Sequence, residues 1–419
     1  MLKKVEVQEK NFENYKPFIS EAIKFEIKQN ASLLRGKKII HINSTAQGGG
    51  VAEILHSLIP IEKSLGLDVD WLVFSNFKNQ EQFFEITKKM HNSLQGSSVS
   101  LSSEEKKLYC QVNHILADEI SSISPDLLVI HDPQPCALIS DFNEIPMISR
   151  IHIDLTNPNS DTLNFIGEYL ERYDTILFSC QNFVPKNVEL ENTVISHPAI
   201  DPLTVKNQDM GTSEAEEILA NLNIDCSRPL LTQVSRFDPW KDPFGVIDAF
   251  KVVKKKYPTA QLVLSGIVQA QDDPEAIRII EDVKKKATEE KDIFLFTAIE
   301  QLKGISDLKF INALQSRSDV IFQKSLREGF GLTVTEAMWK GQPVIGGNVG
   351  GIRLQIKDGV NGFLVNSPTE AAEKALFLLD NPDERKRMGQ AARESVKEKF
   401  LITRFLQDEL KIMSGIRKR

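Results

Sequence analysis

The segment from Glu328 to Glu336 combines residue types that can bind a phosphorylated, hydroxylated ligand. Its two carboxylates are separated by seven residues that include a Gly-Phe-Gly turn. An apolar run at 319–322 predicts a strand before the turn, and a helix is predicted at Thr333–Lys340. A strand, a glycine turn and a helix start direct backbone N–H groups and the helix dipole at an anion. Because each carboxylate can accept hydrogen bonds from paired hydroxyls, the segment predicts binding of a nucleotide sugar.

A second cluster of charged residues, Arg236 and Lys241, follows the apolar run at 229–234. Both lie at the carboxyl end of a predicted strand, which is where open α/β sheets bind ligands. A guanidinium and an ammonium can hold a pyrophosphate and neutralise a departing nucleoside diphosphate. Either cation alone would more often be an ordinary surface residue near a turn. Their occurrence together with the glutamate pair favours a binding site.

Three consecutive glycines, residues 48–50, follow the first predicted strand and open a helix. Gly49 and Gly50 let the backbone approach a ligand and direct N–H groups towards it. The spacing is not the dinucleotide pattern G-x-G-x-x-G, and the lysine of a P-loop is absent. A tight turn without a ligand is the alternative interpretation.

Two histidines, His131 and His152, lie at the ends of later predicted strands. Neither has a partner at the spacing of metal ligands, so a zinc site is not predicted. A single histidine is more often structural. Two at equivalent strand ends favour a place in the site.

Length and composition predict a globular protein of two domains. The chain of 419 residues exceeds what one hydrophobic core usually supports, and its 41% hydrophobic and 26% charged residues are ordinary. A net charge of -7 disfavours a nucleic-acid partner. The four scattered cysteines predict neither a disulfide framework nor a zinc site. Without an apolar run of signal or membrane-spanning type, we expect a cytoplasmic protein with no membrane partner.

Alternating apolar runs and helical patterns predict an α/β fold with two Rossmann-like, doubly wound domains facing each other across a deep cleft. We expect an N-terminal extension at 1–36, an acceptor domain at 37–197 and a nucleotide-sugar domain at 198–393, with a proline-containing linker near their boundary. Residues 383–415 are predicted to be helical, and the amphipathic segment 394–419 is expected to reach back to the first domain. Strands are predicted at 38–43, 69–74, 127–130, 147–151 and 175–178, and again at 230–234, 261–265, 293–296, 320–322, 343–345 and 362–365.

The motifs described above occur together in a known group of enzymes. Over almost its whole length the chain resembles the family 4 retaining glycosyltransferases of the GT-B fold, of which the Glu-x7-Glu element is typical. Three segments, 43–55, 131–135 and 324–333, are similar to trehalose glycosyltransferring synthases and to the related retaining trehalose phosphorylases.

The resemblance implies a role for each candidate residue. On the donor side, Arg236 and Lys241 would hold the phosphates, Glu336 the ribose and Glu328 the transferred glucose. Further donor contacts are expected from Gly329, Phe330, Gly331, Leu332 and Thr333. In the first domain, His152 would lie beside the reacting face of the donor sugar. The remaining expected substrate contacts are Gly49, Gly50, His131, Asp132 and Asp154.

The resemblance also implies a reaction, in which glucose is transferred reversibly between NDP-glucose and glucose, with trehalose as the disaccharide and the anomeric configuration retained. ADP- or UDP-glucose would be the co-substrate, no bound cofactor or metal is expected, and the family suggests a homodimer. Two alternatives stay open. One is a trehalose phosphorylase using inorganic phosphate, against which Glu336 argues because free phosphate has no ribose. The other is a sugar-nucleotide-binding regulator without turnover.

Overall fold

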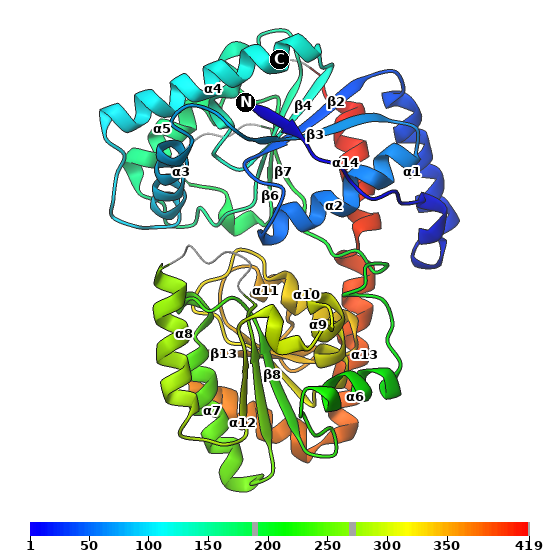
Figure 1. Ribbon diagram of the computed structural model, residues 1–419. Coiled ribbons are helices and arrows are strands. Elements are labelled where there is room, and N and C mark those ends of the chain that lie inside the picture. Colours follow the sequence, from blue (N-terminus) through cyan, green and yellow to red (C-terminus); the bar gives the residue numbers. More distant parts are fainter. Residues whose placement is uncertain (187–191, 268–273, 418–419) are drawn as a thin grey trace. The chain divides into compact units, whose positions relative to one another are not determined.

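The computed structural model describes residues 1–186, 192–267 and 274–417, which form two compact units (Figure 1). The first unit comprises Met1–Pro198 together with Ile402–Arg419, and the second comprises Ala199–Leu401. The chain therefore passes from one unit to the other after Pro198 and returns after Leu401. Residues 394–401, which the sequence grouped with the final helix, belong to the second unit.

The first unit contains a seven-stranded sheet in which every pairing is parallel except that of the first strand. Its strand order is β1-β3-β2-β4-β5-β6-β7. The apolar runs become strands that are buried on both faces, as a parallel sheet covered by helices requires. The strands are β1 (Leu2–Lys4), β2 (Lys38–Asn43), β3 (Asp68–Phe74), β4 (Leu127–His131), β5 (Met147–Ile151), β6 (Thr175–Phe178) and β7 (Thr193–Ile195).

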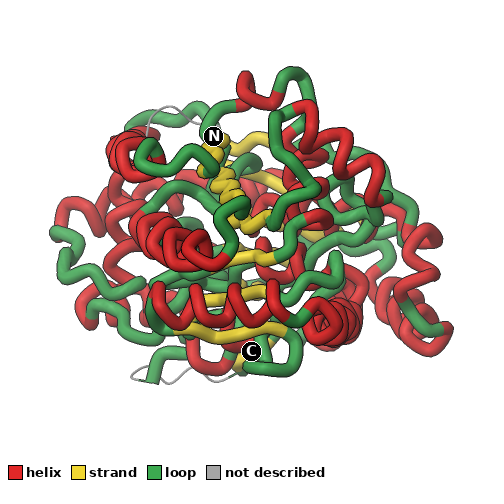
Figure 2. The backbone as a smooth tube through the Cα atoms, turned by 90° about the horizontal axis from the view of Figure 1, so that it is seen from below, coloured by secondary structure: helices red, strands yellow, loops and turns green. Residues whose placement is uncertain are grey.

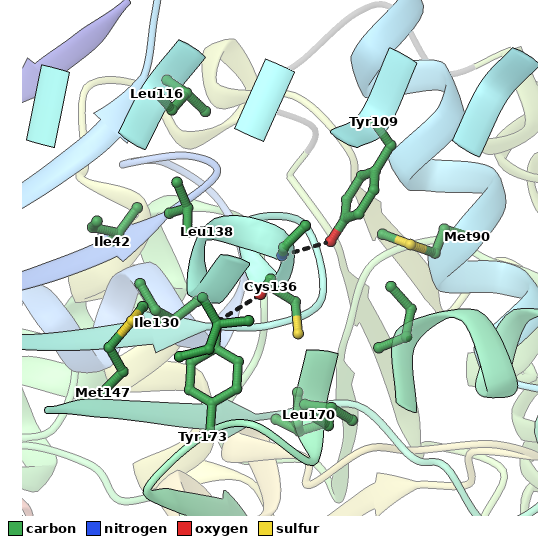
Figure 3. Packing of buried hydrophobic residues seen from close by; sticks show 14 of the residues in the cluster. Ile42, Met90, Tyr109, Leu116, Ile130, Cys136, Leu138, Met147, Leu170 and Tyr173 are labelled. Carbon is green, nitrogen blue, oxygen red and sulfur yellow. Dashed lines mark hydrogen bonds between the residues drawn. The ribbon is translucent and has the colours of Figure 1, made fainter. Parts of the chain in front are cut away.

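Helices cover this sheet and enclose a core of aliphatic and aromatic side chains (Figure 3). Two tyrosines in that core have their hydroxyls satisfied by backbone groups. Tyr109 donates to the carbonyl of Pro133 at 2.7 Å, and Tyr173 donates to that of Cys136 at 2.7 Å. The helices are η1 (Phe12–Phe18), α1 (Glu21–Leu34), α2 (Gly49–Ser64), α3 (Gln80–Leu94), α4 (Ser103–Ile123), η2 (Cys136–Asp141), α5 (Ser160–Leu170), η3 (Gln181–Phe183) and α14 (Ile402–Gly415).

The second unit contains a six-stranded, wholly parallel sheet with the order β10-β9-β8-β11-β12-β13. Figure 2 shows the strands of the whole chain, in yellow, with helices, in red, on both sides of them. The strands are β8 (Leu230–Val234), β9 (Gln261–Ser265), β10 (Ile293–Phe296), β11 (Val320–Gln323), β12 (Val344–Gly347) and β13 (Gly362–Val365). The helices are α6 (Thr212–Asn221), η4 (Pro239–Lys241), α7 (Pro243–Lys256), α8 (Pro274–Ala287), η5 (Ile299–Leu302), α9 (Asp307–Arg317), α10 (Leu332–Trp339), α11 (Ile352–Gln355), α12 (Pro368–Asp380) and α13 (Pro382–Lys399).

The prediction of an α/β fold with two Rossmann-like domains is confirmed, and two details differ from expectation. Residues 2–4, which the sequence placed in an extension, form β1 and pair antiparallel with β3. The helix expected to be continuous from 383 to 415 is interrupted at Phe400–Leu401. There the backbone N–H of Ile200 donates to the carbonyl of Phe400 at 2.9 Å, so this segment pairs with the linker instead of continuing the helix.

The final helix, α14, packs against α1 and α2 of the first unit (Figure 1). Gln407 donates to Glu26 at 2.7 Å, and Phe405 and Leu410 are fully buried. None of the helices in the described parts of the chain is both long enough and apolar enough to cross a membrane.

Candidate active site

In the second unit, Lys241 and Glu328 form a close ion pair beyond the carboxyl ends of β8 and β11. The Lys241 Nζ lies 2.5 Å from Glu328 Oε2, and both side chains are largely buried. Lys241 is positioned by η4, whose N-cap Asp238 accepts hydrogen bonds from the N–H groups of Trp240 and Lys241. The two predicted residues therefore meet, 87 positions apart in the chain. A partly buried ammonium beside a carboxylate can exchange that partner for a phosphate.

The loop that carries Glu328 requires glycine both within it and beside it. Gly331 has a φ of +84°, a left-handed conformation that side chains rarely adopt, and it caps α10 without a side-chain hydrogen bond. A Cβ atom on Gly350 would lie 1.8 Å from the carbonyl oxygen of Glu328, and one on Gly351 would lie 2.4 Å from that of Gly329. Gly350 and Gly351 were not predicted as site residues. Their contribution is close backbone packing that only the folded loops reveal.

A buried lysine, Lys324, was also missed by the sequence analysis. Only 4% of its side chain is exposed, and it forms an ion pair with Asp242. Gln233 joins the same two loops, since its side chain donates to the carbonyl of Lys241 at 2.9 Å and accepts from the N–H of Lys324 at 3.1 Å. These residues hold Lys241 in place. The available signal was their charge and polarity at the strand ends.

Arg236 lies in a different environment from the one expected. Its side chain is 86% exposed, and its ion pair with Asp238 is long, at 3.5 Å. The structure therefore does not bring Arg236 against the Lys241–Glu328 pair. An exposed guanidinium on a loop can still turn towards an anion, because its desolvation is small.

Glu336 is buried in α10, with 1% of its side chain exposed. Its Oε1 lies 2.6 Å from the Nζ of Lys206, a residue of the linker that the sequence analysis did not single out. Within the described chain neither oxygen of Glu336 has a hydrogen bond of good geometry, so the ion pair leaves acceptor capacity unused. A buried carboxylate in this state is suited to accept hydrogen bonds from ligand hydroxyls.

In the first unit, the glycine loop follows β2 and opens α2. Gly48 and Gly49 have φ values of +75° and +77°, and a Cβ atom on either would meet nothing within 4 Å. Backbone conformation, and not crowding, is therefore what requires glycine here. Gly48 is the N-cap of α2 and provides no side-chain cap, and Gly50 follows in the first turn. The N–H groups at this helix start remain available to an anionic or hydroxylated ligand.

His131 and His152 are joined by hydrogen bonds to a third histidine that the sequence analysis missed. His41 Nδ1 lies 3.1 Å from His131 Nε2, and His131 Nδ1 lies 3.1 Å from His152 Nε2. Neighbouring rings are stacked with centroids 5.4 Å apart in both cases. His41 was read as part of a buried strand, and its polarity within the run Lys38–Asn43 was the only signal.

Burial makes these histidines neutral. It lowers the pKa of His41 to about 3, with the nearby positive charge of Arg150 as the second cause. The pKa values of His131 and His152 also lie well below 6.5, with burial again the largest cause. Imidazoles in this state act as one-donor, one-acceptor groups and not as cations.

The two aspartates near His152 differ in their surroundings. Burial raises the pKa of Asp132 to about 7, although its Oδ1 accepts a hydrogen bond from the backbone N–H of His152 at 2.8 Å. Asp132 also has a left-handed φ of +65°. Asp154 accepts from the N–H and the hydroxyl of Thr156 at 2.8 Å and 2.5 Å, so it closes a turn. Across the described residues, no three side chains of the metal-ligating types come together to hold a metal ion.

Two largely parallel α/β sheets, each with charged or polar groups beyond its strands' carboxyl ends, are the architecture of the GT-B fold. Solved structures share this fold. A trehalose-phosphate synthase from Burkholderia xenovorans has a TM-score of 0.73 at 14% identity and covers 91% of this chain and 100% of its own. Anabaena HepE has a TM-score of 0.66 at 16% identity and covers 90% of this chain and 100% of its own.

Sequence relatives narrow the class. Residues 41–185 match the family described as trehalose synthase, N-terminal domain, and residues 214–395 match glycosyl transferases group 1. The trehalose synthase of Thermococcus litoralis is 44% identical over 97% of both chains, and that of Rubrobacter xylanophilus is 38% identical over 99% of both. A trehalose phosphorylase of Grifola frondosa is 30% identical over 84% of this chain and 53% of its own.

The chain therefore belongs to the trehalose synthase family. The resemblance proposed from the motifs and the prediction of a glycosyltransferase are confirmed, and the phosphorylases are more distant relatives. The roles of the individual site residues stay predictions.

Proposed function

We propose that this chain is a retaining glucosyltransferase that transfers glucose reversibly between NDP-glucose and glucose, with trehalose as the disaccharide. The family supports this reaction, because trehalose synthases are up to 44% identical over 97% of the chain. The main structural observation in support of this site is the Lys241–Glu328 ion pair, at 2.5 Å, beyond the carboxyl ends of β8 and β11.

In the forward reaction, the anomeric hydroxyl oxygen of the acceptor glucose forms a bond with C1 of the donor glucose. The bond from C1 to the phosphate oxygen breaks on the same face, and the hydroxyl proton passes to the leaving diphosphate. Lys241, with Arg236 turning in from solvent, neutralises the charge that develops on that diphosphate. The N–H groups at the start of α10, near Gly331 and Leu332, add partial positive charge.

Glu328 and Glu336 are assigned to the hydroxyls of the donor. When the diphosphate binds Lys241, Glu328 is released to accept hydrogen bonds from the transferred glucose. Glu336 keeps Lys206 as its counter-charge and accepts from the ribose with its unused capacity. Because inorganic phosphate brings no ribose, this arrangement favours a nucleotide over phosphorolysis.

In the first unit we assign His152 to the donor sugar and Asp132, Asp154 and His131 to the acceptor side. Asp132 is the better candidate of the two aspartates, because Asp154 is already engaged by Thr156. Gly49 and Gly50 contribute backbone N–H groups at the start of α2.

The expected partners are a nucleoside diphosphate sugar, glucose and trehalose, with ADP or UDP as the nucleotide. Our proposal includes a cytoplasmic location and a homodimer, which the family and composition suggest. No step requires a metal ion, since Lys241 and Arg236 supply positive charge for the diphosphate.

The test is to incubate the protein with trehalose and, separately, ADP, UDP, GDP or inorganic phosphate without added metal. Proton NMR would identify the product and the configuration at C1. We expect NDP-glucose with retained configuration. Glucose 1-phosphate as the sole product would establish the phosphorylase alternative, and binding without any product would establish the regulator.

A further inference from the structure

Four polar side chains form a row through the interior of the first unit. The row runs from Glu62 on α2 to His41 on β2, His131 on β4 and His152 after β5. Glu62 Oε2 lies 3.6 Å from His41 Nε2, and each following nitrogen pair is 3.1 Å apart. Glu62 and His41 are fully buried, and His152 is partly exposed. The row thus connects an enclosed acid to a histidine that can reach a ligand.

A row of neutral imidazoles has only two hydrogen-bonding directions. Each neutral ring carries one N–H donor and one acceptor nitrogen, so the first bond determines all the others. If His41 donates from Nδ1, His131 accepts at Nε2 and donates from its own Nδ1. His152 then accepts at Nε2 and carries its proton on Nδ1. The opposite direction leaves a lone pair on Nδ1 of His152.

Glu62 sets the direction because it lies at the closed end of the row. Within the described chain, neither of its oxygens nor the Nε2 of His41 has a hydrogen bond of good geometry. The nearby cation Arg150 is already engaged, since Glu409 on α14 lies 2.5 Å from its guanidinium. An ionised Glu62 would therefore be a buried charge without a counter-ion.

The surroundings of Glu62 favour its neutral, protonated form. Burial raises its pKa well above the usual value, and the negative charge of Glu409 raises it further. A protonated Glu62 satisfies its O–H group by donating to His41 Nε2, with a small approach from 3.6 Å. Accepting from an Nε2–H instead would leave that buried O–H without a partner among the described residues. This choice propagates along the row.

We propose that Glu62 and His41 are positioning residues for the transferase reaction. Acting through His131, they hold His152 in the tautomer with the proton on Nδ1, so that it presents an N–H donor to an oxygen of the donor sugar. The placement of His152 at that sugar rests on the function proposed above. The tautomers of the row do not depend on that placement.

The first experiment measures the tautomers directly. The full chain is labelled with 15N-histidine and its ring nitrogens are observed by NMR at neutral pH. We expect His41, His131 and His152 to carry their protons on Nδ1. The exposed His114 is the reference that titrates, with its pKa raised above the usual value by the hydrogen bond to Asp141. The variant His41→Asn assigns one set of signals. Protons on Nε2 in these three rings would overturn the proposal, whether or not the protein has transferase activity.

The second experiment separates positioning from packing. The amide of His41→Asn keeps an N–H near the position of Nδ1, whereas His41→Leu removes it. Loss of one orienting hydrogen bond should lower kcat roughly tenfold in the leucine variant, with the KM for NDP-glucose changed less than about threefold. The asparagine variant should retain most of the activity. Equal kcat values in the two variants would overturn the proposal.

The corresponding pair at the closed end is Glu62→Gln and Glu62→Leu. Glutamine keeps a donor towards His41, so we expect kcat within about threefold of the unmodified protein. Leucine has no donor and should lower kcat by the same factor as His41→Leu. If glutamine reduced kcat as strongly as leucine did, a protonated Glu62 would not be the source of the direction. A chain without any transferase activity would refute the proposed function. The NMR experiment would then still determine the tautomers of the three histidines.

Discussion

The three histidines of the first unit's candidate site are neutral rings that hydrogen-bond to one another, whereas the side chains beyond β8 and β11 of the second unit are charged and form ion pairs. Neutral histidines that hydrogen-bond only to one another keep their arrangement when a ligand binds. They are therefore suited to hold a substrate-binding side chain in a constant orientation. In an ion pair, by contrast, an anionic ligand can replace the carboxylate as the partner of the cation. We therefore propose that the first unit orients substrate groups and that the second exchanges the carboxylate partner of Lys241 for a phosphate.

One ion pair in the first unit is buried and stabilises the fold, and breaking it should have the largest effect on the free energy of unfolding. Arg150 and Glu409 lie 2.5 Å apart with almost no exposure, and the guanidinium also covers the ring of Phe405. We expect Glu409→Ala to lower the free energy of unfolding by about 3–5 kcal/mol, because a buried cation is left unpaired. Urea unfolding followed by circular dichroism measures this. The exposed pair Arg387–Glu384 is the control, and Glu384→Ala should cost less than about 1 kcal/mol.

Charge exchange in the second unit is tested by Lys241→Ala. If Lys241 binds the diphosphate as proposed, the variant loses a charge-assisted contact, so turnover should fall by about 30- to 1000-fold, equivalent to about 2–4 kcal/mol, with little change in Tm. Lys251→Ala is the matched control, since Lys251 pairs with the exposed Glu289. Near-normal activity of the Lys241 variant would show that Lys241 does not stabilise the departing diphosphate.

Ribose recognition predicts an effect of intermediate size for Glu336→Gln. The amide keeps the shape of the side chain but loses the charge-assisted bonds to hydroxyls, so nucleotide affinity should fall about tenfold or more. Trehalose affinity should change little. Calorimetry with ADP, UDP and phosphate measures this difference. Unchanged nucleotide affinity together with phosphate-dependent cleavage would favour the phosphorylase alternative.

The smallest effect concerns the neutral groups of the first unit and depends on pH. The pKa of Asp132 is raised to about 7 from an ordinary 3.8, so between these values the folded chain binds a proton that the unfolded chain does not. Its contribution to stability is therefore present at low pH and is lost as the pH rises towards 7.

This loss is measured by comparing the unmodified chain with Asp132→Asn. The difference in Tm, unmodified minus variant, should fall between about pH 4 and pH 7 and then level off. Buried neutral histidines act in the opposite direction, because the unfolded chain binds protons there that the folded one does not. Their contribution cancels in the difference. Parallel Tm curves would show that Asp132 titrates normally.

Local patterns were sufficient for much of this protein. Apolar runs bounded by glycine and proline predicted the strands and the α/β fold, because a parallel sheet buried on both faces needs such runs. The seven-residue spacing of Glu328 and Glu336 and the glycine loop at residues 48–50 predicted a sugar-nucleotide site and led to the family, since their geometry depends on neighbouring residues alone.

Only the tertiary structure decided which distant residues become partners. It paired Glu336 with Lys206, joined His131 to His41 and left the side chain of Arg236 exposed to solvent. These outcomes depend on strand order, on burial and on loop packing, which bring together residues with no common local pattern. For the same reason the final helix was expected to be continuous, whereas the folded chain interrupts it at Phe400–Leu401 to pair with the linker.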